Sequence, residues 1–103
     1  MIKVNIIKNN DQFKELTING HALYDDYGKD IVCAAVSSTV ITTINGILLI
    51  NDFIDYQEQK DKITIKVIYQ DEITTKLLTN MVNNLTELSK DYKDNIKIMI
   101  KEE

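Results

Sequence analysis

The sequence predicts an α/β protein, an α+β sandwich of the order ββαββαβ with a largely antiparallel sheet and two helices. Several short segments alternate apolar and polar residues and are joined by polar turns, which is typical of β-hairpins. Two longer segments follow the pattern of helices instead. The length of 103 residues and the hydrophobic share of 44% are those of one globular domain spanning residues 1–103.

The chain is predicted to begin with a hairpin of two strands, at residues 1–8 and 12–19. An Asn-Asn-Asp sequence between them is a turn signal. The second strand ends at Gly20, which can interrupt the alternation of faces, so the pattern leaves the direction of the His21 side chain open. The residues expected to face the core from this hairpin are Ile2, Val4, Ile6, Leu16 and Ile18.

A helix is predicted from about residue 31 to 49, with Asp30 as its N-cap. Its many β-branched residues weaken its intrinsic propensity, so we expect burial to support it. The uncharged segment 31–50 also has about the length of a membrane span. Its serine, threonine and asparagine side chains are more polar than those of a usual span, which favours a buried helix over a membrane segment.

The second half of the chain is predicted to hold another hairpin, a second helix and a last strand. The hairpin joins a short strand within 52–59 to a strand at 63–69, with Ile63, Ile65, Val67 and Tyr69 on one side. The last strand is expected at 96–100. The second helix is predicted at 71–91 and laid on the sheet through Ile73, Leu77, Leu78, Met81, Val82, Leu85 and Leu88.

Charge and cysteine content narrow the class of partner. The formal net charge is −4, and all twelve basic residues are lysine, so a general nucleic-acid binder is not expected. An acidic protein better suits a basic partner such as a lysine-rich peptide. A single cysteine excludes an intramolecular disulfide and favours a reducing compartment. The N-terminal residues lack the layout of a signal peptide, so we expect a cytoplasmic protein.

The only histidine and the only cysteine, His21 and Cys33, are candidates for a base and a nucleophile. With Asp30 as the cap, Cys33 occupies the third helical position, where N–H groups without helical acceptors would stabilise a thiolate. The same N–H groups could bind the oxyanion of a tetrahedral intermediate. A nearby imidazole would act as base toward the thiol and then as acid toward the leaving amine.

Each of these residues also has a purely structural interpretation. A cysteine with apolar neighbours is commonly a small buried hydrophobe, and a histidine near a turn is often a surface residue. One cysteine and one histidine leave a zinc site short of ligands, so no metal or cofactor is expected. Asp30 is either a helix cap or the orienter of His21, and the loop residues Tyr24 and Tyr27 either line a cleft or cover a core edge.

A family resemblance bears on these alternatives. Gly20-His21-Ala22, then Gly28, then Asp30-Ile31-Val32-Cys33-Ala34-Ala35-Val36-Ser37, followed by Asn45-Gly46, resembles the ribosomal-processing cysteine protease family (Prp, YsxB-like). These motifs cover about a third of the chain, and the order of strands and helices over the remainder is similar. The spacing of Gly-His-Ala and Asp-Ile-Val-Cys-Ala is far more specific than an isolated pair of histidine and cysteine.

The resemblance implies a Cys33–His21 protease that removes the N-terminal extension of a large-subunit ribosomal protein of the L27 family. It also implies a homodimer, a mobile lid between the two residues, and a peptide substrate that is hydrophobic or aromatic before the cleaved bond and lysine-rich after it. The substrate-binding residues it suggests are Gly20, Tyr24, Tyr27, Asp30 and Ser37. The alternative is a non-catalytic, ribosome-associated binding module of the same fold.

Overall fold

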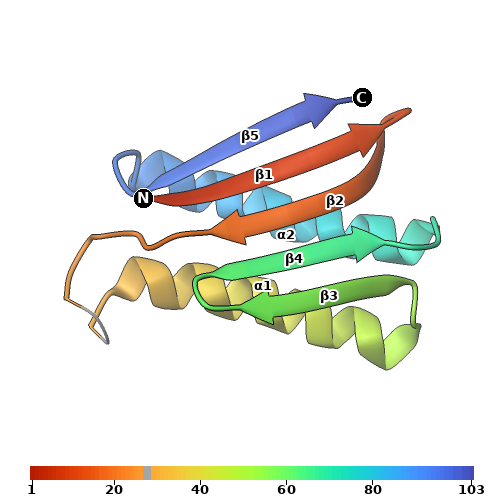
Figure 1. The fold of residues 1–103 in the computed structure, drawn as a ribbon, viewed down its shortest axis with the longest axis horizontal. Helices are drawn as coiled ribbons and strands as arrows, with labels where there is room; N and C mark the ends of the chain where they lie inside the picture. The colour runs from red at the N-terminus through yellow and green to blue at the C-terminus, as the bar shows by residue number, and fades with distance from the viewer. Residues whose placement is uncertain (27–28) are drawn as a thin grey trace.

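The structure, a computed structural model that describes residues 1–26 and 29–103, has the predicted order ββαββαβ (Figure 1). Its elements are β1 (Ile2–Asn9), β2 (Gln12–Asn19), α1 (Ile31–Ile50), β3 (Ile54–Gln59), β4 (Lys62–Val67), α2 (Glu72–Asp91) and β5 (Ile96–Glu102).

The five strands form one mixed sheet in the order β3-β4-β2-β1-β5. Three of the four neighbouring pairs are antiparallel, in agreement with the expected hairpins, whereas β1 and β5 are parallel. The parallel pair arises because α2 carries the chain back to the end of the sheet at which β1 starts (Figure 1). There the N–H group of Ile2 donates to the carbonyl oxygen of Asn95 at 2.8 Å, which joins the first and last strands.

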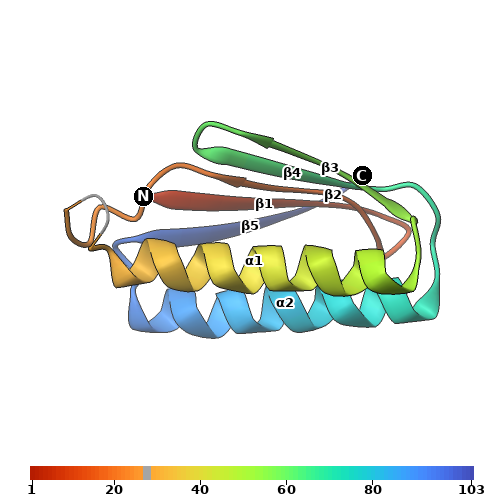
Figure 2. The same cartoon turned by 90° about the horizontal axis from the view of Figure 1, so that it is seen from below.

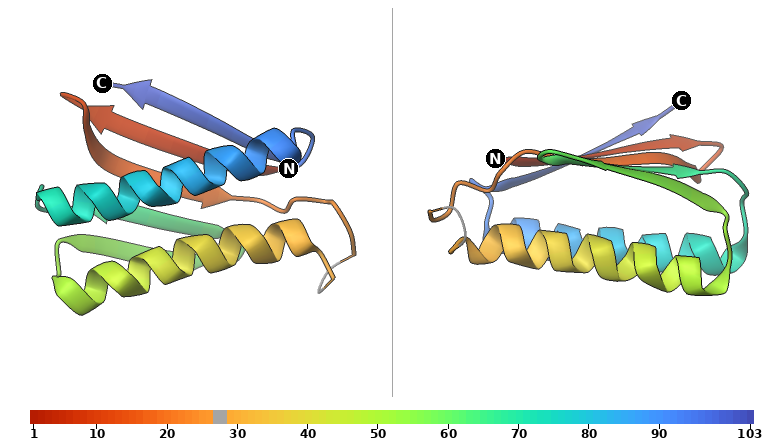
Figure 3. Two further views of the ribbon diagram at one scale, coloured as in Figure 1. Left: turned by 180° about the vertical axis from the view of Figure 1, so that it is seen from behind. Right: turned by 60° about the horizontal axis from the view of Figure 1, so that its bottom comes forward.

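Both helices cover the same face of the sheet and lie side by side, so the protein has two layers (Figures 2 and 3). The core fills the space between these layers. From α1 it receives residues spaced three or four apart, as expected for one stripe of a buried helix. The residues of this stripe are Val32, Val36, Val40, Ile44 and Ile47. From the sheet it receives the alternate residues Ile2, Val4, Ile6, Leu16, Ile18, Ile54, Ile65 and Ile96.

Helix α1 is long and apolar enough to cross a membrane by length and composition alone. Only its inner stripe is buried, against the sheet and α2, so α1 is a surface helix that supplies part of the core rather than the fully buried helix that was expected. The α1 side chains on the outward face are mostly small or uncharged. That face is therefore uncharged, with polar side chains along its middle and apolar ones at its C-terminal end.

Two predicted positions are wrong, one at the end of a strand and one on the buried face of α2. Strand β4 ends at Val67, and Tyr69 lies beyond it, 62% exposed, with its ring packed edge-on against Phe53. In α2, Ile73 is exposed and Thr74 is buried in its place. Thr74 is accommodated because its N–H group donates to the capping carboxylate of Asp71 and its hydroxyl accepts a hydrogen bond from the Asn51 side chain.

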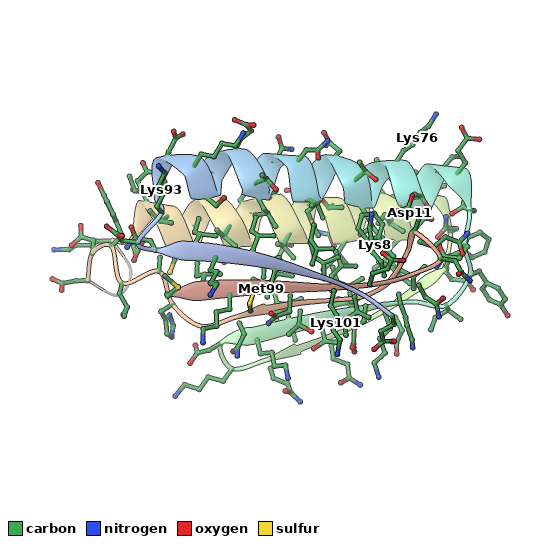
Figure 4. The ribbon with its side chains drawn as sticks, turned by 90° about the horizontal axis from the view of Figure 1, so that it is seen from above. Lys8, Asp11, Lys76, Lys93, Met99 and Lys101 are labelled. Carbon is green, nitrogen blue, oxygen red and sulfur yellow. The ribbon has the colours of Figure 1, made fainter. Side chains whose placement is uncertain are left out.

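The second face of the sheet is open. Figure 4 shows Met99 and Lys101 on β5 pointing away from the helices, while Lys76 points outward from α2 on the opposite side of the molecule. The sheet is therefore packed on one face only, as is common for antiparallel hairpins. The segment between β2 and α1, which holds His21, leaves the two-layer body at one of its ends (Figure 1).

Candidate active site

The site is built where the end of β2, the turn between β3 and β4, and the start of α1 meet at one end of the molecule (Figure 1). The side chains of His21, Cys33 and Ser37 line two adjoining hollows there, of about 540 and 340 Å³. Leu23 and Asp25 border the larger hollow, and the smaller one extends toward the β3–β4 turn. The site is thus an open groove over the first turns of α1.

Asp30 is the N-cap of α1, as predicted, and it also fastens the preceding loop. Its Oδ1 atom accepts hydrogen bonds from the N–H groups of Val32 at 2.9 Å and Cys33 at 3.0 Å. Its Oδ2 atom accepts from the N–H groups of Tyr24 at 2.9 Å and Asp25 at 3.3 Å. One carboxylate therefore ties the loop to the helix that carries the cysteine.

These contacts favour the ionised form of Asp30. Burial raises the pKa of its carboxyl, but hydrogen bonds from the four backbone N–H groups outweigh burial and hold the pKa below its ordinary value of 3.8. The carboxylate is accordingly charged at every pH at which a thiol protease is expected to work.

The Cys33 sulfur is partly exposed and contacts the loop rather than the helix backbone. Its Sγ atom accepts a hydrogen bond from the N–H group of Ala22 at 3.2 Å. The expectation that the first helical N–H groups would serve the thiolate or an oxyanion is wrong for Val32 and Cys33, because Asp30 takes both. The N–H donor that stabilises charge on this sulfur comes instead from the residue next to His21.

The backbone carbonyl group of Ala22 is held by a second hydrogen bond. The side-chain amide of Asn95, just before β5, donates to the carbonyl oxygen of Ala22 at 2.9 Å. The Ala22 side chain itself is buried in the core. Both the N–H and the C=O group of Ala22 are therefore engaged, so the chain that carries His21 is fixed beside Cys33.

His21 is exposed, and the carboxylate beside its ring is not that of Asp30, which the sequence offered as either helix cap or orienter. The Nε2 atom lies 2.8 Å from Oδ1 of Asp61, in the turn between β3 and β4, with both side chains about two-fifths exposed. The carboxylate that contacts the imidazole is thus that of Asp61 rather than that of Asp30. The sequence marked Asp61 only as part of a polar turn, and no local signal connects that turn to His21.

Gly20 places His21 through a backbone conformation that other residues rarely adopt. Its φ is +98°, and a Cβ atom at this position would lie 2.5 Å from the carbonyl oxygen of Met1. Its N–H group donates to the backbone carbonyl of Asp61 at 2.9 Å. Gly20 also borders the smaller hollow. A side chain here would collide with the backbone of Met1, just before β1, and displace the chain leading into the site.

The structure separates Tyr24 from the other described residues that were predicted to bind substrate. The Tyr24 ring packs edge-on against Tyr92 at the end of α2, with ring centres 5.3 Å apart, and it borders neither hollow. Tyr24 therefore covers a core edge, one of its two predicted roles. Tyr27 lies outside the described residues, as does Gly28. Leu23, which the sequence did not single out, lines the larger hollow with a φ of +58°.

The arrangement contains the parts that a thiol nucleophile needs: a partly exposed sulfur with a backbone N–H donor, and an imidazole lining the same hollows. In residues 1–26 and 29–103 there is no group of three or more histidine, cysteine, aspartate or glutamate side chains placed to hold a metal ion. The chemistry that this part of the chain supports is covalent catalysis by Cys33.

Comparison with known proteins agrees with this chemistry. The family model described as Cysteine protease Prp matches residues 1–97. The chain is 27% identical to the ribosomal processing cysteine protease Prp of Staphylococcus aureus strain Mu50, over 98% of this chain and 100% of that protein. It is 24% identical to the protein of the same name from Bacillus subtilis strain 168, over 95% and 96%.

A solved structure has the same fold. It is that of an essential ribosomal processing protease Prp from S. aureus, in complex with a covalently linked product peptide. The two chains superpose with a TM-score of 0.94 at 25% identity, covering 98% of this chain and 100% of the other. In that relative a peptide is therefore attached to the protein through a covalent bond.

Proposed function

Because the chain belongs to the cysteine protease Prp family, we propose that it removes the N-terminal extension of a large-subunit ribosomal protein of the L27 family, using Cys33 and His21. The observation that carries this proposal is that both residues line the same groove, at the positions of the family's Gly-His-Ala and Asp-Ile-Val-Cys-Ala motifs. Such cleavage would precede ribosome assembly.

The reaction follows from the chemistry of the two side chains. His21 accepts the proton of the Cys33 thiol, and the Sγ atom attacks the carbonyl carbon of the scissile peptide bond. The C–S bond forms, the C–N bond breaks, and the imidazolium returns the proton to the leaving amine. Water then attacks the thioester, with His21 again as base, and releases the carboxylate product and the free thiol.

The groove suits a peptide that is apolar before the cleaved bond and lysine-rich after it. Leu23 and Ala34 border the larger hollow and offer apolar contact. Asp25 borders the same hollow, and the protein carries a net charge of −4, so lysine side chains would be attracted. Ser37 lines both hollows and can donate a hydrogen bond to a bound backbone.

The decisive experiment incubates the protein with a peptide spanning the extension and the mature N-terminus. We expect a single cut, which Cys33→Ala abolishes and His21→Ala slows by about 10²–10⁴-fold, the usual contribution of a general base. Ser37→Ala should weaken peptide binding, whereas Ser38→Ala, one residue along on the exposed surface of α1, should not. Binding without turnover by the unaltered protein would instead identify a non-catalytic module.

We further propose that the chain is a cytoplasmic homodimer. The uncharged α1 ends in the exposed apolar residues Leu48, Leu49 and Ile50, and Leu49 is 89% exposed, which is typical of an interaction surface. The single cysteine suits a reducing compartment. Light scattering on the purified protein should give twice the chain mass, and cell fractionation should place the protein in the soluble fraction.

A further inference from the structure

Asp61 belongs to neither motif of the family resemblance, yet it makes two contacts with the segment that carries His21. Its carboxylate Oδ1 lies 2.8 Å from Nε2 of His21, and its backbone carbonyl accepts the N–H group of Gly20 at 2.9 Å. Asp61 has a φ of +62°, a conformation that aspartate, asparagine and glycine tolerate better than other residues. The turn between β3 and β4 therefore holds both the backbone and the ring that precede Cys33.

The side-chain contact has a consequence for the imidazole. An ionised carboxylate can only accept hydrogen bonds, so the Nε2 atom facing Asp61 must carry a proton. In the neutral ring the remaining nitrogen, Nδ1, then holds the lone pair that can accept a proton from a thiol. A carboxylate in this position also stabilises the imidazolium that forms when the thiol proton is transferred.

Among the described carboxylates around the groove, Asp61 is the one that forms an ion pair with His21. Asp30 is engaged by four backbone N–H groups of its own loop and helix. Asp25 borders the larger hollow, and Glu58 and Lys62 border the smaller one, but the carboxylate in contact with the ring is that of Asp61. In residues 1–26 and 29–103, the titratable groups that share the hollows with His21 are Asp25, Asp30, Cys33, Glu58, Asp61 and Lys62.

We propose that Asp61 is the positioning residue of the site: it holds His21 with Nε2 protonated, so that Nδ1 is the atom that takes the proton from Cys33. This inference rests on the proposed role of His21 as base, but it makes a statement about the ring that does not require peptide cleavage. It extends the Cys33–His21 pair to a cysteine–histidine–aspartate arrangement whose third member comes from a different part of the sheet.

The first test measures directly which nitrogen of the His21 ring carries the proton. The protein has one histidine, so ¹⁵N labelling of histidine gives an unambiguous spectrum of the two ring nitrogens. At a pH where the ring is neutral, we expect the Nε2-protonated tautomer to dominate. Asp61→Asn, which keeps a side chain that the turn conformation accepts, should shift the ring toward a mixture of tautomers. An Nδ1-protonated ring, or a tautomer ratio unchanged by Asp61→Asn, would overturn the proposal whether or not the protein cleaves any peptide.

The second test measures the reactivity of Cys33 and the rate of peptide cleavage. In Asp61→Asn and Asp61→Gly, the alkylation of Cys33 by iodoacetamide at pH 7 should slow, with an altered pH profile. The kcat on the extension peptide should fall at least about tenfold while KM changes little, since the residue acts on proton transfer rather than on binding. Asp55→Asn removes an exposed carboxylate from the far end of the same hairpin and should leave both readouts unchanged.

The results separate the possible failures. If Asp61→Asn alkylates and cleaves as fast as the unaltered protein, or faster, Asp61 does not position the base and the proposal is wrong. If the unaltered protein cleaves no peptide while the tautomer still depends on Asp61, the proposed function fails and the contact stands. Thermal unfolding of each variant identifies a loss that comes only from an unstable turn, because such a loss would lower Tm without changing the tautomer.

Discussion

At the scale of single residues, the site depends on side chains that bind backbone rather than on contacts between side chains alone. Asp30 is the main example, since its two carboxylate oxygens accept from two N–H groups of α1 and two of the preceding loop. Asn95 does the same for the carbonyl of Ala22. The loop residues Tyr24 and Asp25 are therefore held by hydrogen bonds to the Asp30 carboxylate, and loss of its negative charge would weaken these bonds.

The charge of Asp30 gives a pH-dependent prediction. Because the pKa of Asp30 in the folded protein lies below 3.8, its ionised form stabilises the fold above that pH, and this stabilisation is lost as the pH falls through the lower folded-state value. Asp30→Asn should lower Tm between pH 5 and 7. The Oδ2 atom of Asp30 accepts from the N–H groups of Tyr24 and Asp25, and the NH₂ group that replaces it would point one donor at two others. The Tm difference should shrink below about pH 3.8.

Thermal melts of the two proteins across this pH range make the measurement, and the kcat/KM of the variant should fall as the loop loosens. Asp52→Asn is the control, because it removes an exposed carboxylate at the other end of α1. A Tm difference that stays constant from pH 7 down to pH 3 would mean that the charge of Asp30 does not stabilise the fold.

At the scale of elements, α1 serves both packing and chemistry. Its buried stripe anchors it to the sheet, so that its first two turns present Cys33 and Ser37 to the groove in a fixed position. Its composition is not that of a strong helix former, and it contains Gly46 in its interior. The helix is therefore stabilised mainly by burial, and its intrinsic propensity can be improved without touching the site.

Gly46→Ala is predicted to stabilise the protein. A Cβ atom built at Gly46 meets no heavy atom within 4 Å among the described neighbours, and glycine inside a helix costs about 0.5–1 kcal/mol relative to alanine. We expect the free energy of unfolding in urea to rise by about that amount, with unchanged activity. Ser38→Gly on the exposed side of the same helix should have the opposite effect. A loss of stability in Gly46→Ala would indicate that another surface packs closely against this position.

At the scale of the whole molecule, the net negative charge should favour binding of a basic substrate. All positive charge comes from lysine, and the net charge of −4 combines with Asp25 at the groove to attract a basic peptide. The two-layer body places this groove at one end, away from the exposed apolar end of α1 (Figure 2). Peptide binding and self-association can therefore occupy different surfaces.

This attraction predicts a salt effect. The kcat/KM for a peptide with lysines after the cleaved bond should fall several-fold as salt rises from 0.05 to 0.5 M, because screening weakens contacts between exposed charges. A matched peptide with glutamine in place of lysine should show little dependence, and Asp25→Asn should reduce the dependence for the lysine peptide. Equal salt slopes for the two peptides would exclude electrostatic attraction as the source of preference.

Local pattern determined most of the fold. The alternation around Ile2, Val4 and Ile6 and the polar turns predicted two hairpins, and the three- and four-residue spacing around Leu78 and Leu85 predicted α2. The position of Asp30 before an apolar run predicted the helix start, which places Cys33 in the first turn. These predictions are successful because periodicity and capping depend on residues only a few positions apart.

The features of the fold and the site that local pattern did not predict depend on contacts between distant parts of the chain. The parallel pairing of β1 with β5, the hydrogen bond from Asn95 to Ala22 and the contact between His21 and Asp61 each join segments that no local pattern connects. The sequence therefore identified the cysteine, the histidine and the helix cap by itself. Only the tertiary structure decided which carboxylate faces the imidazole, because that choice depends on strand order and on the turn that the sheet brings next to Gly20.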